Sequence, residues 1–361
     1  MTILTDDRAD RRHSFRAQSL SKRYPHILQR TLKEVTDASV VAAMGSLAGF
    51  IAGDHPLSIP VGLDDPYWLE LYQRHEGVRV PDIDFLTLEY LLFHQILLAH
   101  RYFDEFKDPF ANDKRLDLAD ALPAYALAFD GLTDLPSALM VSLLGNAHDA
   151  SQLHIKTDGR VLDLDALPEA VGASVVDIIC DNAGHEYLSD LALAAYLLRT
   201  TTSNVRLHVK AMPWFVSDVT QADTVAVFDA IEASPGRYSA WGSTLMEGRQ
   251  SSRLEINAHP HWTRPVNFGE GNLIDALGTR ESLVIVKGDL NYRRCLADIS
   301  TDIFTPWRSL PYLPDVPVVA LRSVKSHCWA GVSRDKWPED FNADHFPMDG
   351  TLFCTQTMAP Q

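Results

Sequence analysis

One short segment combines a carboxylate and an amide where a metal ion could bind. Asp181 and Asn182 directly follow a β-branched run, and Gly184 then permits a tight turn. Adjacent carboxylate and amide oxygens suit a hard cation such as Mg²⁺ or Mn²⁺. Glu186 and Asp190 lie four residues apart on the predicted helix that follows, and therefore on one face of it. Asp and Asn also commonly cap helices, so that structural role remains open.

Two further segments carry similar chemistry. Asp289 follows Gly288 at the end of another β-branched run, in Lys287–Arg294 (KGDLNYRR). Arg322–Ser326 (RSVKS) concentrates two cations and two hydroxyl groups, which can bind a phosphate through bidentate, point-charge and hydroxyl contacts. A single charged strand end is usually part of the solvent-exposed edge of a sheet. Three such strand ends in one chain, each with ligand-type side chains, indicate a site for a metal and a phosphate.

Other polar residues have either a structural or a functional interpretation. His259 and His261 lie beside a tryptophan, and histidines in such a place are more often packed than metal-binding. Lys210 and Asp218 flank a turn, where they either line the cleft or form a surface pair. Asn146 and Asp149 either reach the site or belong to a turn.

The spacing of apolar residues predicts the elements that position these segments. β-branched runs alternate with helical stretches after about residue 161, which indicates βαβ units and a mainly parallel sheet. In such sheets ligands bind beyond the carboxyl ends of the strands. The predicted strands are Val175–Cys180, Val205–Met212, Leu254–Ala258, Leu283–Val286 and Val316–Leu321, and the predicted helices are Tyr187–Leu198 and Ala222–Ala233.

The first part of the chain has a different pattern. Tyr24–Val35 and Asp82–Tyr102 carry apolar residues at three- and four-residue spacing, which is typical of helices. The sequence therefore predicts a flexible tail over residues 1–12, a helical subdomain over 13–160 and an α/β catalytic domain over 161–361. Thr220 and Asp223 before the helix at Ala222 resemble a capping box.

Composition limits the partners. The 361 residues carry a formal charge of −16, which argues against binding to a nucleic-acid backbone but permits a small phosphorylated ligand. The four cysteines form no C-x-x-C pair, so neither a disulfide framework nor a zinc site is indicated. The N-terminal residues lack the apolar core of a secretory signal, and the apolar stretch Leu86–Leu98 is too short and polar to span a bilayer. A cytoplasmic setting without membrane partners is expected.

In order and spacing, these segments resemble the damage-control phosphatase family, also described as the acidic-residue-methyltransferase-like metal-binding family. The resemblance rests on Asp181–Leu198 (DNAGHEYLSDLALAAYLL), KGDLNYRR and RSVK, is closest to the subfamily with an R-T-x-K motif, and extends to Lys210–Thr220 (KAMPWFVSDVT). Two departures are Ser323, where the subfamily usually has Thr, and His185, where the family often has an aromatic or aliphatic residue. The residues after Arg334 do not match the usual ending.

The resemblance implies a three-layer α/β/α sandwich with an N-terminal helical bundle and one divalent metal ion (Mn, Co, Ni or Mg). Carried over by matching position, Asp181, Asn182 and Asp289 would bind the metal, and Glu186 would lie near the ligand. Phosphate contacts would come from Arg322, Ser323 and Lys325. The implied substrates are sugar phosphates and related small metabolites.

We expect hydrolysis of a phosphomonoester, with Asp181, Asp289 and Lys325 as the catalytic residues. Asp289 could orient the attacking water while Lys325 stabilises charge on the phosphoryl oxygens. A phosphoaspartate route through Asp181 is less favoured, because Ala183 stands where the haloacid dehalogenase type of site has a second Asp.

Three alternatives remain open. They are an S-adenosylmethionine-dependent carboxyl methyltransferase, a metabolite-binding module without turnover, and a family member recruited to a different metal-dependent reaction. The substrate, the metal and the oligomeric state do not follow from the sequence.

Overall fold

The computed structural model describes most of the chain. The described residues are 16–33, 35–125, 129–130, 132–145, 160–163, 173–233, 238–269, 273–277, 282–299, 301–310, 316–342, 346 and 348–358. Contacts divide the chain into two compact units, Met1–Ala111 and Asn112–Gln361. The candidate site lies within the second unit. The predicted boundary at residue 160 remains a prediction, although helix α8 (Leu135–Gly145) and all but the first residue of α7 (Ala111–Tyr125) are grouped with the sheet.

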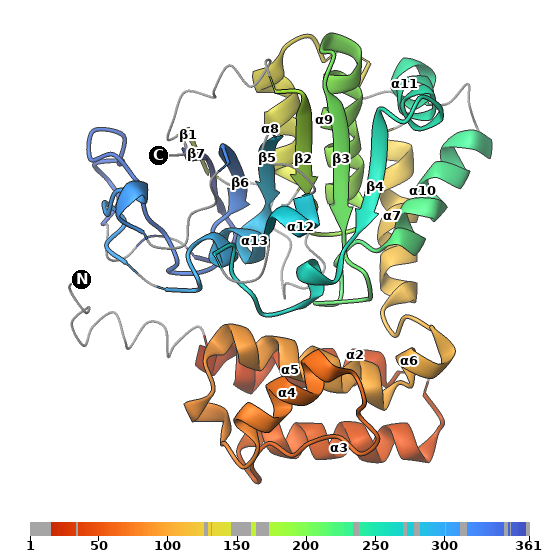
Figure 1. The fold of residues 1–361 in the computed structure, drawn as a ribbon, viewed down its shortest axis with the longest axis vertical. Coiled ribbons are helices and arrows are strands. Elements are labelled where there is room, and N and C mark those ends of the chain that lie inside the picture. Colours follow the sequence, from red (N-terminus) through yellow and green to blue (C-terminus); the bar gives the residue numbers. More distant parts are fainter. Residues whose placement is uncertain are drawn as a thin grey trace. The chain divides into compact units, whose positions relative to one another are not determined.

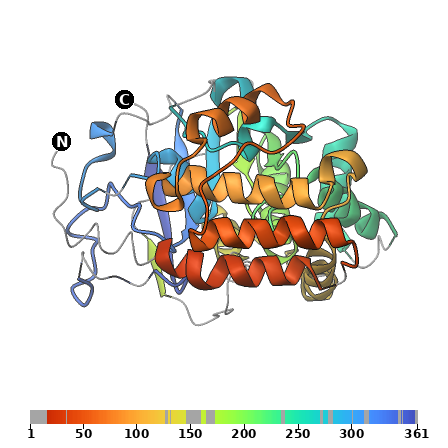
Figure 2. The same cartoon turned by 90° about the horizontal axis from the view of Figure 1, so that it is seen from below.

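The first unit is helical, as predicted. Helix α3 contacts both α2 and α5, and Figure 2 shows these helices side by side. Asp37, Asp65 and Asp84 precede α3, α4 and α5, and each accepts a hydrogen bond from a backbone N–H of the first turn. The elements are the π-helix Ser19–Arg23, α2 (Tyr24–Thr31), α3 (Ala38–Ala52), α4 (Pro66–His75), the 3₁₀-helix Val80–Asp82, α5 (Phe85–Ala99) and α6 (Tyr102–Glu105).

The second unit contains a seven-stranded sheet within the described residues, in the order β1-β7-β6-β5-β2-β3-β4. All neighbouring strands are parallel except β6 and β7. The strands are β1 (Arg160–Asp163), β2 (Val175–Ile179), β3 (Asn204–Val209), β4 (Leu254–Ala258), β5 (Ser282–Lys287), β6 (Val318–Ser323) and β7 (Leu352–Met358).

Side chains of the central strands alternate between two separate cores. In β5, Leu283 and Ile285 belong to one core, whereas Val284 and Val286 belong to the other. Strands buried on both faces read as continuous apolar runs, which explains the β-branched runs of the sequence. Figure 1 shows α8 and α9 behind the sheet and α12 and α13 in front of it. The predicted three-layer α/β/α class is thus confirmed.

The helices of the second unit begin with α7 at the boundary between the units. The capping box before α10 is confirmed: the Thr220 N–H donates to Asp223 Oδ2 at 2.8 Å, and the Asp223 N–H donates to Thr220 Oγ1 at 3.4 Å. The helices are α7 (Ala111–Tyr125), α8 (Leu135–Gly145), α9 (His185–Thr200), α10 (Gln221–Ala233), α11 (Ser239–Gln250), the 3₁₀-helix Pro260–Thr263, α12 (Leu273–Leu277), α13 (Gly288–Cys295) and the 3₁₀-helix Trp307–Ser309.

The order of the strands places a switch point between β2 and β5. From β2 the chain adds β3 and then β4 on one side, and it returns to add β5 and β6 on the other. Connections leave a parallel sheet in opposite directions at such a point, which opens a crevice at the carboxyl ends of the two strands. The residues there are Asp181 and Asn182 after β2, and Gly288 and Asp289 after β5.

The five predicted strands are all present, with boundaries shifted by a few residues. Strands β1 and β7 were not predicted. No helix of the described residues is long and apolar enough to cross a membrane.

Candidate functional site

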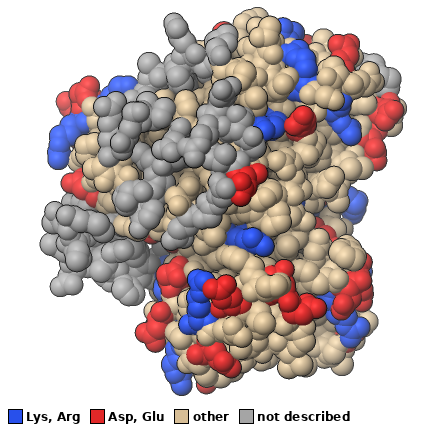
Figure 3. Space-filling model, in the orientation of Figure 1, with Lys and Arg blue, Asp and Glu red and all other residues tan. Residues whose placement is uncertain are grey.

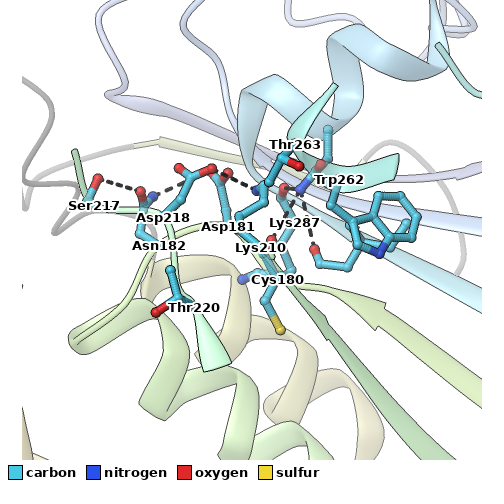
Figure 4. Close-up of polar contacts among 12 residues, drawn as sticks. Cys180, Asp181, Asn182, Lys210, Ser217, Asp218, Thr220, Trp262, Thr263 and Lys287 are labelled. Carbon is cyan, nitrogen blue, oxygen red and sulfur yellow. Dashed lines mark hydrogen bonds and ion pairs between the residues drawn. The ribbon is translucent and has the colours of Figure 1, made fainter. Parts of the chain in front are cut away.

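The side chain of Asn182 is oriented by three neighbours. Its Nδ2 donates to Glu186 Oε2 at 2.8 Å and to Asp181 Oδ2 at 3.3 Å, while its Oδ1 accepts a 2.6 Å hydrogen bond from Ser217 Oγ. Figure 4 shows Ser217, Asn182 and Asp181 in one row, joined by these hydrogen bonds. The amide nitrogen of Asn182 thus faces Glu186, and its amide oxygen faces Ser217.

The loop after β3 brings Asp218 to the same place. Asn182 and Asp218 form an isolated antiparallel bridge, and the Val219 N–H donates to the Asp181 carbonyl at 2.9 Å. Asp218 Oδ2 lies 2.8 Å from Lys210 Nζ, and both side chains are buried. The sequence left open whether Lys210 and Asp218 line a cleft or form a surface pair. The structure makes them a buried ion pair beside Asn182 (Figure 4).

This loop has an unusual backbone. Phe215 and Val216 have positive φ values of 49° and 76°, a conformation that costs energy for a β-branched residue. The turn nevertheless lets the Ala183 N–H donate to the Ser217 carbonyl at 2.7 Å. The sequence gives no signal for this turn, because no glycine marks it, and Ser217 was therefore missed as a neighbour of Asn182.

Asp289 lies at the start of α13, directly after Gly288, and has a cationic partner. Its Oδ1 accepts from Arg322 Nε at 2.7 Å and from the Lys325 backbone N–H at 3.0 Å. Burial would raise the pKa of Asp289, but the charges of Arg322 and Arg293 and the Lys325 N–H outweigh burial and hold that pKa below its ordinary value. Asp289 is therefore a carboxylate at neutral pH.

The predicted phosphate-binding residues lie at the end of β6. Ser323 is fully buried in the strand, and Lys325 follows it with a side chain that is almost buried. Arg322 is fully buried, and each of its three nitrogens donates within the protein: Nε to Asp289, Nη1 to the Cys328 carbonyl at 2.7 Å and Nη2 to Ser326. The Arg322 guanidinium is thus largely engaged by the protein itself and has no exposed surface.

Gly288 allows the Asp181 carboxylate to lie against the backbone next to Asp289. Gly288 has φ +77°, and a Cβ atom added to it would lie 1.9 Å from Asp181 Oδ2. The Asp181 carboxylate thus rests directly on the backbone that precedes Asp289, in space that any other residue would fill.

We expect Gly288→Ala to displace the Asp181 carboxylate and to weaken divalent-metal binding by about tenfold or more, as changes around metal ligands commonly do. Gly77→Ala is the matched control, because Gly77 has the same φ of +77° and nothing within 4 Å of the added Cβ. Isothermal titration with Mn²⁺ would compare the two. Equal affinities in both variants would contradict the proposed contact.

A buried lysine lies behind these ligands. Lys287 Nζ is 3.0 Å from Asp190 Oδ1 and 3.5 Å from Glu186 Oε1, and it also donates to the Ser142 carbonyl. Burial raises the pKa of Asp190 to about 6, against the opposing charge of Lys287. Glu186 and Asp190 share one helix face, as predicted, and both lie against Lys287.

The first turn of α9 is occupied by another carboxylate. The His185 N–H donates to Asp117 Oδ2 at 3.3 Å, and His185 Nε2 lies 3.1 Å from Asp120 Oδ2. One backbone N–H group of the turn at Gly184 is thus already engaged by Asp117. Asp117 and Asp120 come from α7 and were not predicted as neighbours of the site.

The remaining candidates do not join this cluster in the described residues. His259 Nδ1 accepts from the His261 N–H at 3.1 Å, and His261 is buried with its ring 4.8 Å from that of Trp262, which is the packed interpretation. Asn146 and Asp149 lie outside the described residues.

Asp181, Asn182, Asp218 and Asp289 offer oxygen atoms, the ligand type that Mg²⁺ and Mn²⁺ prefer. In the described part of the chain, however, no three His, Cys, Asp or Glu side chains are grouped closely enough to hold a metal ion. The chemistry of these side chains therefore suits a hard divalent cation, but binding would require the carboxylates to draw together around it, with the amide oxygen of Asn182 as a further ligand.

Comparison with known proteins gives the family. Residues 8–337 match the damage-control phosphatase ARMT1-like domain. Proteins named "Damage-control phosphatase ARMT1" are 34% identical over 165 residues in Xenopus laevis, 33% over 169 in Danio rerio and 28% over 171 in Homo sapiens. These alignments cover 44%, 44% and 45% of this chain, and 37%, 37% and 39% of the relatives.

A crystal structure of a DUF89 family protein from Pyrococcus horikoshii is also similar, with a TM-score of 0.48 and 14% identity over 90% of this chain and 93% of that one. The family match covers nearly the whole chain and agrees with the resemblance found in the sequence. The chain belongs to the damage-control phosphatase ARMT1-like family.

Proposed function

We propose that this protein is a divalent-metal-dependent phosphatase that hydrolyses phosphomonoesters of small metabolites such as sugar phosphates. The observation that carries the proposal is that the Asp181 carboxylate, beside Asn182 and Asp218, lies against Gly288 directly before Asp289 at the switch point of the sheet. Family membership supports the same reaction class, because the relatives are named phosphatases.

The cation would be held by Asp181, Asn182 and Asp289, the set expected from the sequence, with Asp218 as a further ligand from the loop after β3. Asp218 is included because its backbone forms a β-bridge with that of Asn182. Mn²⁺, Co²⁺, Ni²⁺ and Mg²⁺ are the candidate metals. When bound, such a cation supplies Lewis-acid stabilisation of negative charge that develops on the phosphoryl oxygens.

The protein's own side chains would orient the attacking water and bind the phosphoryl group. Asp289, kept ionised by Arg322, would orient the attacking water through the oxygen that does not face Arg322 and Lys325. The Lys325 ammonium would stabilise charge on the phosphoryl group, and Ser323 would add a hydroxyl contact. Since Arg322 already donates to Asp289, we assign the larger share of phosphate binding to Lys325.

Surface charge agrees with a small substrate. On the face that Figure 3 shows, acidic and basic side chains of the described residues are interspersed, and the basic ones are scattered. Binding to a nucleic-acid backbone needs clustered Lys and Arg. We therefore keep a small phosphorylated metabolite as the proposed partner.

The test is phosphate release from p-nitrophenyl phosphate and a panel of sugar phosphates, after chelation and re-addition of each candidate metal. We expect no release from the chelated protein and restored release with at least one metal. Transfer of a labelled methyl group from S-adenosylmethionine to a carboxylate, in place of phosphate release, would instead support the methyltransferase alternative.

A further inference from the structure

Arg322 lies over two aromatic rings in the described structure. Its guanidinium carbon lies 4.0 Å from the ring centroid of Tyr292 and 5.6 Å from that of Trp329. A buried guanidinium gains from such stacking because the ring faces are negative and the cation has lost its water. The two rings fix the plane of Arg322, and that plane determines how Arg322 Nε approaches Asp289.

One residue at the far end of the chain joins these two rings. Gln356 Oε1 accepts from Tyr292 Oη at 2.9 Å and from Trp329 Nε1 at 3.3 Å, while Gln356 Nε2 donates to the Ala330 carbonyl at 2.8 Å. Gln356, Tyr292 and Trp329 are all fully buried. All of the amide's polar atoms are therefore engaged, and its orientation is set.

Gln356 lies in β7, which is antiparallel to β6 and carries Gln356 opposite Ala320. It falls outside the residues that match the family domain, 8–337. A glutamine at this place has a specific chemical use, because a single amide oxygen can accept from a phenol and an indole while the amide nitrogen ties the group to the backbone.

We propose that Gln356 is a positioning residue for Asp289 and acts through the Tyr292–Trp329 clamp on Arg322. Gln356 fixes the two rings, the rings fix Arg322, and Arg322 fixes the Asp289 carboxylate that also accepts from the Lys325 N–H. The geometric part of this proposal stands on the contacts alone. Its consequence for metal binding rests on the proposed function.

The first test uses hydrogen exchange and needs no metal. The Lys325 N–H donates to Asp289 Oδ1, so its exchange rate reports whether that carboxylate is held in place. In the full chain, we expect Gln356→Leu to make the Lys325 amide exchange at least about tenfold faster. Met358→Ala is the matched control, since Met358 is buried on the same strand and its truncation costs stability without touching the clamp.

Equal acceleration of the Lys325 amide in both variants, or none in Gln356→Leu, would overturn the proposal. If Gln356→Leu does not fold, Tyr292→Phe replaces it, because that change removes one hydrogen bond and keeps the ring against Arg322. The Lys325 amide is then expected to exchange faster in Tyr292→Phe than in wild type, with no such change in Met358→Ala. No acceleration in Tyr292→Phe would count against the clamp.

The second test measures Mn²⁺ affinity by titration calorimetry. We expect Gln356→Leu to weaken Mn²⁺ binding about tenfold, because mutations of residues that position metal ligands commonly reduce metal affinity by such a factor. Met358→Ala should leave the affinity unchanged. In an Arg322→Lys background, Gln356→Leu should weaken binding no further, because the residue through which it acts is already altered. Additive losses would contradict action through Arg322.

The two proposals fail in different ways. A wild-type protein that releases no phosphate with any metal refutes the proposed function, whereas the exchange rate of the Lys325 amide still decides the role of Gln356. Conversely, an active enzyme with an unchanged Lys325 amide in Gln356→Leu refutes the clamp alone.

Discussion

Replacing Asp181 by Asn is expected to lower Mn²⁺ affinity by at least about a hundredfold and phosphate release by about a thousandfold. The carboxylate rests on Gly288, between Asn182 and the segment that carries Asp289, so its charge lies at the centre of the proposed ligand set. Loss of several kcal/mol of charge stabilisation corresponds to such a factor, at about 1.4 kcal/mol for each tenfold change.

Asp229→Asn is the control for Asp181→Asn, because it removes the same charge from an exposed position on α10. Calorimetry with Mn²⁺ and a phosphate-release assay would be run on both variants beside wild type. Unchanged affinity in a folded Asp181→Asn protein would remove Asp181 from the ligand set.

Replacing Lys287 by Met is expected to cost about 3–5 kcal/mol of stability, which is typical when one partner of a buried ion pair is removed. Glu186 and Asp190 would then share a fully buried site without their cation. Urea denaturation of the metal-free protein measures the loss. A cost below about 1 kcal/mol would contradict this account of Lys287.

The loss in Lys287→Met should depend on pH. The pKa of Asp190 is already raised to about 6, above its value in the unfolded chain. An acid with a raised folded-state pKa costs stability as pH rises from the unfolded pKa through the folded one. Removal of Lys287 raises that pKa further, so the variant should lose more stability at pH 8 than at pH 5. Adding Asp190→Leu to Lys287→Met should recover part of the loss.

The central sheet was predictable because its strands are buried on both faces. The apolar runs of β2, β5 and β6 have little local competition from turn residues, and the polar residues that end them fall at the carboxyl edge, where ligands bind. The positions of Asp181, Asn182 and Asp289 at this edge could therefore be predicted, whereas their role as metal ligands stays a prediction.

Strands β1 and β7 were less accessible to prediction. Arg160–Asp163 is only four residues long and lies at an edge, and Leu352–Met358 mixes apolar residues with Thr and Gln at the end of a chain segment rich in Asp, Trp and Pro. Both segments are strands because of their pairing in the sheet, in which β7 lies between β1 and β6. Such pairing can override a weak local preference.

The parts of the site that depend on long-range contacts could not be read from the sequence. Ser217 and Asp218 reach Asn182 through a turn with positive φ at Phe215 and Val216, and neither residue type signals such a turn. Arg322 was predicted to bind phosphate, a role that remains a prediction, but its contacts with Asp289 and Tyr292 depend on the packing of β6 against α13.

The most direct test of the central claim is Mn²⁺-dependent phosphate release from the chelated full-length chain, measured beside Asp181→Asn under the same conditions. The proposed site predicts release that appears on addition of Mn²⁺ or another candidate metal and is lost in the variant. Release that survives chelation, or that Asp181→Asn retains in full, would contradict a metal-dependent phosphatase site at the junction of β2 and β5.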